Sequence, residues 1–184
     1  MKKTLIAASI ATATLVTTNV VLAADKNMYV GASYDMMTID VDGLGVDFDT
    51  SVLSLKAGTS FTENLGVEVV YGTGLSDESI SADGDSVSLG VKSYYGLYLT
   101  GLLPITDQFN ITSKLGYTNT TIEAKLVDSS GTLKEDDDDG SVSWGIGASF
   151  DVTQEFAVTA DYTMLNDQDD GDVSGFTIGA KYNF

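Results

Sequence analysis

The strongest constraint on the fold is an alternation of apolar with small or polar residues, which recurs in eight runs after Ala24. In the segment 142–150, for example, every second residue is apolar and each residue between them is Ser or Gly. Successive side chains of a strand point to opposite faces, so this period of two predicts β-strands. Most runs cover about nine residues, the length of a tilted strand that crosses a bilayer. No segment keeps a helical period, and the sequence therefore predicts an all-β fold.

The chemistry of the two faces indicates what kind of sheet these strands form. Alternation alone also fits a soluble β-sandwich or a lipocalin-type barrel. Here the apolar faces carry no charge, whereas the opposite faces combine Gly, Ser and Lys with Tyr and acidic residues. A Gly-rich face in water would weaken the strands without benefit, while lipid outside and a packed polar lumen inside suit both faces. We expect an eight-stranded antiparallel up-and-down transmembrane β-barrel.

The lengths of the connections predict the orientation of the barrel. Short turns are expected at about 62–65, 104–108 and 151–155, and longer acidic loops at about 38–50, 76–86, 127–140 and 166–174. Outer-membrane barrels have short periplasmic turns and longer external loops, so both termini are expected in the periplasm. Outward aromatic residues then form two girdles: Phe61, Phe109, Phe150, Phe156 and Phe184 at the periplasmic end, and Tyr34, Tyr117, Trp144, Tyr162 and Phe176 towards the external end.

The N-terminal segment has the layout of an export signal. Lys2 and Lys3 precede an apolar stretch over residues 5–16, and Val21 and Ala23 place small residues at the two positions that determine cleavage. This apolar stretch is too short for a membrane-spanning helix, which needs about 20 residues. We expect a cleavable signal peptide over residues 1–23 and an outer-membrane barrel domain over residues 24–184.

The composition excludes several classes of function. The chain has no His and no Cys, which removes His-based catalytic triads, thiolate nucleophiles, disulfides and the common transition-metal sites. The formal net charge of -18 argues against binding to nucleic acid, which requires a basic surface. The acidic residues show no acid/base pair separated by environment. We therefore expect no enzymatic activity and no nucleic-acid partner.

The end of the last strand carries an aromatic pattern, in which Tyr182 and Phe184 share the apolar face. Together with the segments 28–34 (MYVGASY) and 64–68 (NLGVE), this pattern resembles the small eight-stranded OmpA/OmpX-type barrels of Gram-negative bacteria. The resemblance covers the whole mature chain, without the peptidoglycan-binding domain of longer OmpA members. It implies a monomer in the cell outer membrane, in contact with lipid and lipopolysaccharide, whose Tyr182 and Phe184 are read by the barrel assembly machinery.

The charged residues of the strands are expected to form a network in the lumen, where an unpaired charge is costly. Closure of the barrel makes the seventh, eighth and first strands neighbours, which predicts Lys181 between Asp161 and Asp35. Such a ladder could serve as a gate or as a structural plug, and the narrow lumen of eight strands favours the plug. The predicted network consists of Asp35, Lys56, Glu68, Lys92, Lys114, Asp161 and Lys181.

The predicted external loops hold 18 of the 27 acidic residues. Oxygen ligands suit Ca²⁺ or Mg²⁺. A weak site for one of these ions is predicted at Asp167, Asp169, Asp170 and Asp172, which lack the remaining ligands of a twelve-residue calcium loop. A solvated acidic surface is the alternative, and no other cofactor is expected.

These features predict an outer-membrane barrel with a filled polar lumen and acidic external loops, which has a structural or surface-interaction role. The alternative is a narrow, porin-like channel for ions or small solutes. Three tyrosines on the lumen face favour the filled lumen: Tyr29, Tyr94 and Tyr98.

Overall fold

The computed structural model describes residues 27–41, 46–76, 78–82, 85–128, 131–168 and 171–184. The predicted signal peptide lies outside this range. No helix in the described part of the chain is long and apolar enough to span a membrane. The strands are β1 (Met28–Val41), β2 (Val46–Ser60), β3 (Leu65–Ser76), β4 (Glu78–Ala82), β5 (Asp85–Pro104), β6 (Phe109–Asp128), β7 (Gly131–Asp151), β8 (Phe156–Gln168) and β9 (Gly171–Asn183).

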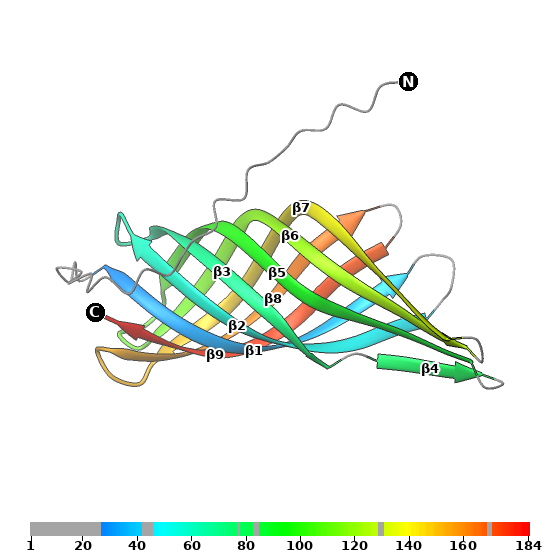
Figure 1. Ribbon diagram of the computed structural model, residues 1–184. Coiled ribbons are helices and arrows are strands. Elements are labelled where there is room, and N and C mark those ends of the chain that lie inside the picture. The colour runs from blue at the N-terminus through cyan, green and yellow to red at the C-terminus, as the bar shows by residue number, and fades with distance from the viewer. Residues whose placement is uncertain (1–26, 42–45, 77, 83–84, 129–130, 169–170) are drawn as a thin grey trace, which may run out of the picture.

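The strands form one closed antiparallel barrel (Figure 1). Their order is β3-β2-β1-β9-β8-β7-β6-β5-β4, and pairing of β3 with β5 closes the sheet. The short β4 also pairs with β5, beyond the end of β3. β3 and β4 are therefore two parts of a single barrel strand, and the predicted eight-stranded antiparallel barrel is confirmed.

The two faces of the sheet differ as the alternation predicts. On β2, the outward Leu55 side chain is 62% exposed, whereas the inward Ser54 is fully buried. A soluble protein rarely exposes a continuous apolar surface of this extent. The exposed apolar side chains surround the barrel, and they include Val30, Leu53, Val69, Leu97, Leu115, Ile146, Val158 and Ile178.

The three short turns share one local structure at the end of the barrel where the chain terminates (Figure 1). Each contains a Thr whose hydroxyl accepts a hydrogen bond from a backbone N–H three residues later. This bond satisfies a backbone donor that the sheet cannot pair. The N–O distances are 2.9 Å from Leu65 to Thr62, 2.9 Å from Phe109 to Thr106 and 3.0 Å from Phe156 to Thr153.

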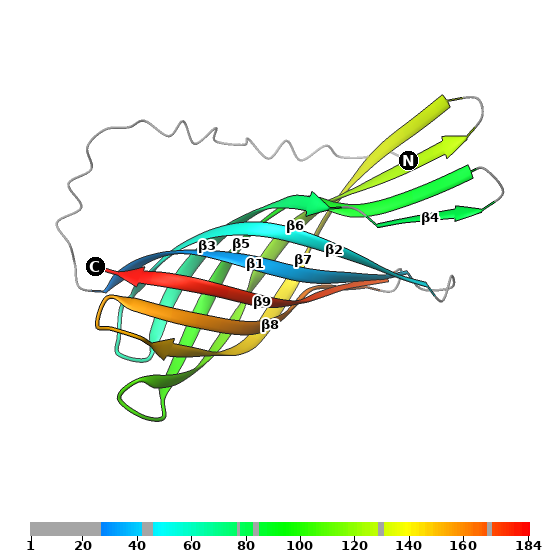
Figure 2. The ribbon, with the colours of Figure 1, turned by 90° about the horizontal axis from the view of Figure 1, so that it is seen from below.

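The strands at the opposite end continue through much of the segments that were expected to be loops, and this expectation was wrong. β6 and β7 extend for 20 and 21 residues, and only two residues separate them. Acidic residues are tolerated there because Thr residues lie opposite them: the Thr121 hydroxyl donates to Asp138 at 2.5 Å, and the Thr38 hydroxyl donates to Asp49 at 2.9 Å. Figure 2 shows the ends of β4 to β7 leaning away from the other strands.

A β-bulge in β5 changes which side chains enter the lumen. The register with β6 shifts between Val91 and Ser93, and an extra residue in one strand interrupts the alternation of faces. Val91 is consequently fully buried, and Lys92 is exposed on the outside. The prediction that Lys92 belongs to the lumen network was therefore wrong.

The bulge predicts losses of stability of very different size for two neighbouring substitutions. Val91→Asp should lower the free energy of unfolding by about 3 kcal/mol or more, because it buries an unpaired charge. Lys92→Asp, the matched control on the outer face, should cost about 1 kcal/mol or less. Urea unfolding of the folded barrel in phospholipid vesicles measures both values. A larger loss for Lys92→Asp would contradict the bulge.

Candidate functional site

The lumen collects six of the seven charged residues that were predicted to lie there. Asp35, Lys56 and Glu68 are buried. Lys114, Asp161 and Lys181 are partly exposed, and they line a cavity together with Lys56 and Glu68.

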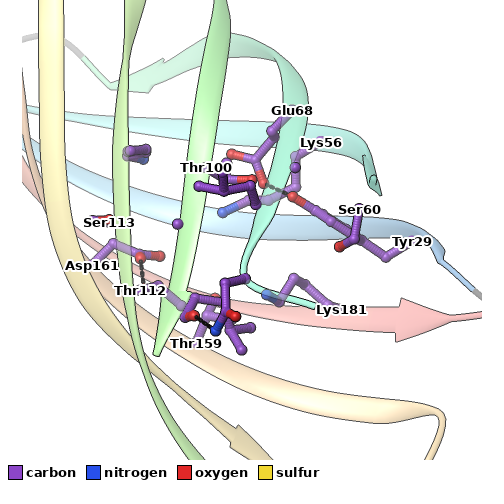
Figure 3. A pocket seen from close by; sticks show the side chains of 16 residues that line it. Tyr29, Lys56, Ser60, Glu68, Thr100, Thr112, Ser113, Thr159, Asp161 and Lys181 are labelled. Carbon is purple, nitrogen blue, oxygen red and sulfur yellow. Dashed lines mark hydrogen bonds between the residues drawn. The ribbon is translucent and has the colours of Figure 1, made fainter. Parts of the chain in front are cut away.

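This cavity, which we call the chamber, has a volume of about 70 Å³. Ser60, Asn64 and Leu102 line it beside the short turns, so it lies at the same end of the barrel as those turns. Its volume is sufficient for several water molecules. Figure 3 shows Glu68 and Tyr29 on one side of the chamber and Asp161 and Thr112 on the other.

The two carboxylates of the chamber are held by hydroxyl groups. The Tyr29 hydroxyl donates to Glu68 Oε2 at 2.7 Å, and the Thr112 hydroxyl donates to Asp161 Oδ1 at 3.1 Å. Gly58 makes room for the tyrosine, because a Cβ at this position would lie 2.4 Å from Tyr29 Cζ. The small residues of the lumen face thus allow large side chains of neighbouring strands to fill the interior.

The lysines of the chamber contact aromatic rings. The Lys181 Nζ lies 5.0 Å from the centroid of the Tyr29 ring, and the Lys114 Nζ lies 5.2 Å from that of Tyr98. These distances suit cation–π interactions. Lys56 is the third lysine of the chamber. Within the described residues, none of the three lysines forms an ion pair with a carboxylate within 4.0 Å.

The predicted ladder from Asp161 through Lys181 to Asp35 was wrong at Asp35, and the strand register gives the reason. Asp161 and Lys181 do line the same chamber. Asp35 and Asp161 both lie opposite Thr177, whereas Lys181 lies opposite Gly31 and Ala157. Four residues of strand separate Thr177 from Lys181, which corresponds to roughly 13 Å. Lys181 therefore lies on the chamber side, away from Asp35.

Two hydroxyl clusters lie deeper in the lumen. In the first, the Ser54 and Tyr94 hydroxyls donate to Asp35 Oδ2, the latter at 2.9 Å. In the second, the hydroxyls of Tyr98 and Thr118 share a hydrogen bond of 2.6 Å, and Ser143 bonds to both. These clusters fix two tyrosine rings across the lumen.

Beyond the hydroxyl clusters, an apolar plug fills the lumen towards the extended strands. The remaining void beside Asp35 and the two tyrosines has a volume of about 10 Å³, enough for about one water molecule. The lumen was expected to be filled and polar; in this half of the barrel its filling is largely apolar. The plug consists of Met37, Ile39, Phe48, Val52, Val70, Val91, Tyr94, Tyr98, Leu165 and Val173.

The residues of the predicted assembly signal pack against one another. The rings of Tyr182 and Phe184 meet edge to face with centroids 5.2 Å apart, and Tyr182 also contacts Phe156 at 5.0 Å. The Phe184 N–H donates to the Met28 carbonyl at 3.0 Å. The C-terminal end of the chain is thus held in the sheet.

The predicted Ca²⁺ or Mg²⁺ site lies partly outside the described residues, since Asp169 and Asp170 are not among them. Asp167 and Asp172 lie opposite each other in β8 and β9. Within the described part of the chain, no group of three acidic side chains is placed to hold a metal ion. The metal site stays a prediction.

Comparison with known proteins identifies the family of this chain. The model of the outer membrane protein beta-barrel domain matches residues 5–184. No match was found among curated protein sequences.

Several solved structures share the fold. Ail, the attachment invasion locus protein of Yersinia pestis, crystallised in complex with the heparin analogue sucrose octasulfate, is 20% identical, with a TM-score of 0.63 over 86% of this chain and 98% of that chain. Neisserial surface protein A is 15% identical, with a TM-score of 0.59 over 85% and 97% of the two chains. OprG from Pseudomonas aeruginosa is 14% identical, with a TM-score of 0.59 over 86% and 96%.

At these identities the solved structures support the fold alone, whereas the family model covers almost the whole sequence. The closed eight-stranded barrel and its apolar outer face agree with that match. The chain belongs to the outer membrane protein β-barrel family, and its location is the outer membrane.

Proposed function

We propose that this protein is a closed barrel that holds an acidic, extended β-sheet at the cell surface, and that it is not a pore. The observation that carries the proposal is the apolar plug, which leaves a void of only about 10 Å³ between the chamber and the extended strands. A hydrated ion would have to displace packed apolar side chains to pass. The protein would then act through its surface and its stability in the membrane.

The proposed orientation is supported by the positions of the short turns and of the long strand ends. Short turns face the periplasm and longer segments face outward in outer-membrane barrels. Here the short turns, the start of β1 and the C-terminus share one end, and the long ends of β5, β6 and β7 share the other. We therefore place both termini in the periplasm and the acidic strands outside.

The external sheet would favour positively charged partners. Asp137 and Asp138 are exposed on β7, and Asp40 and Asp47 are exposed on the β1–β2 hairpin. A surface of one charge attracts counter-ions and opposite charge at long range. Divalent ions held loosely at this surface, including the segment with Asp167 and Asp172, would be consistent with contact to lipopolysaccharide.

Three further proposals concern the oligomeric state, the assembly signal and catalysis. The barrel is proposed to be a monomer surrounded by lipid. The packed pair Tyr182 and Phe184 is proposed as the signal for the assembly machinery. No catalytic role is proposed, because the sequence has neither His nor Cys. In addition, both chamber carboxylates accept hydrogen bonds from hydroxyl groups of the barrel wall.

A narrow channel is the second candidate, and the chamber is the observation that favours it. The chamber provides charged, hydrated space for part of the length of a solute pathway. The path would still have to cross the plug, so the channel function requires the rings of Tyr94 and Tyr98 to move.

Conductance in planar bilayers separates these two functions. The unaltered barrel should give no steady current steps above the lipid leak. Replacing Tyr94, Tyr98, Met37 and Leu165 together by Ala should produce steps, because these side chains line the narrow void. Tyr95→Ala is the matched control, since Tyr95 is exposed on the outer face. Steady current through the unaltered barrel would support the channel instead.

The charge of the external sheet predicts how this chain differs from Ail. Ail crystallised with sucrose octasulfate, a highly anionic sugar. The acidic strands should repel it, so no binding heat is expected when sucrose octasulfate is titrated into the barrel in micelles at low salt. Saturable binding to the extended strands would contradict the proposed surface.

A further inference from the structure

The chamber brings together more hydrogen-bond donors than the protein itself uses. Lys56 from β2, Lys114 from β6 and Lys181 from β9 line it. Figure 3 shows Lys56 and Lys181 reaching into the chamber from different strands. Thr159 also lines it, is 4% exposed, and has a buried hydroxyl oxygen with no hydrogen-bond partner. Among the described residues, the ammonium groups of the chamber form no ion pair and the Thr159 hydroxyl forms no hydrogen bond.

The carboxylates of the chamber do not neutralise these donors by direct contact. Glu68 accepts from Tyr29 and Asp161 accepts from Thr112, so both are bound to the wall of the barrel. Ammonium groups in a low-dielectric interior are costly unless an opposite charge lies close. An anion that contacted the lysines directly would supply the missing acceptor.

The charge balance and size limit which anion could enter. Three lysines against two carboxylates leave the chamber with a formal charge of +1. Asp35 does not line the chamber but lines the adjoining small void, which Lys56 and Lys114 also line, and its Oδ2 accepts hydrogen bonds from Ser54 and Tyr94. A volume of about 70 Å³ suits a halide or a short carboxylate better than a larger sugar acid.

We propose that the chamber is a binding site for one small monovalent anion of halide or short-carboxylate size, held by Lys56, Lys114, Lys181 and the Thr159 hydroxyl. The anion reaches it from the end of the barrel with the short turns and stops at the two tyrosines. The site is separate from the function of the external sheet, because the apolar plug lies between them. It also requires no passage through the barrel.

Crystals of the unaltered protein soaked in sodium bromide give the most direct test. An anomalous bromide peak is expected inside the chamber, within contact distance of at least two of the three ammonium groups. A structure with bromide only on the outer surface would overturn the proposal. This experiment needs no substitution, so it decides the question even where a lysine variant fails to fold.

Solution titration measures the contribution of each lysine. Sodium formate should shift the amide NMR signals of Thr159 and Lys181 with saturation in micelles, whereas sodium gluconate at the same ionic strength should not. Lys56→Met and Lys181→Met keep the apolar stem and should each weaken formate binding by roughly tenfold, the usual loss for a hydrogen bond to a charged group. Lys92→Met, on the outer face, is the matched control.

Comparison of a chamber lysine with a lysine on the outer face distinguishes binding in the chamber from a general effect of salt. Equal formate affinity in Lys181→Met and Lys92→Met would show that the signals report only bulk salt, and the anion site would be rejected. Identical responses to formate and gluconate would reject it as well. A tenfold loss confined to the chamber lysines would support it.

Discussion

The structure depends on one constraint: a backbone N–H or C=O within hydrocarbon must find its partner inside the protein. Closure by pairing β3 with β5 meets this demand, because it removes the free edges of the sheet. The alternation of faces follows, since each strand then meets lipid on one side and the lumen on the other. The same constraint explains the threonines of the short turns, which accept hydrogen bonds from N–H groups that leave the ladder.

Closure with eight strands makes the lumen narrow, and its contents then determine what the barrel can do. Glycines on the lumen face accept the rings of tyrosines from adjacent strands, as Gly72 does for Tyr94. Hydroxyl groups join these rings to Asp35, Thr118 and Ser143. The result is a barrel with a chamber lined by charged residues at one end, an apolar plug towards the other, and charged strands that extend beyond the plug.

The sequence alone was sufficient for the strand count, the closed barrel and its apolar outer face, because a period of two repeated eight times has few other solutions. It was insufficient to predict that Val91 faces the lumen and Lys92 the outside, since a bulge leaves no clear mark in the alternation. The plug was missed because Phe48 lies in an acidic segment that was expected to be a loop. The predicted contact between Asp35 and Lys181 was wrong because the sequence indicated which strands are neighbours but not the register of their residues. A visible signal was also overlooked: Thr62, Thr106 and Thr153 recur at the same place in three turns.

The central claim, that the apolar outer face meets lipid, can be tested with the single Trp of the chain. Trp144 lies on that face and is 44% exposed. In vesicles containing lipids brominated on their acyl chains, its fluorescence should be strongly quenched, while aqueous acrylamide should have little effect. Strong quenching by acrylamide together with no effect of the brominated lipids would place Trp144 in water and contradict the account.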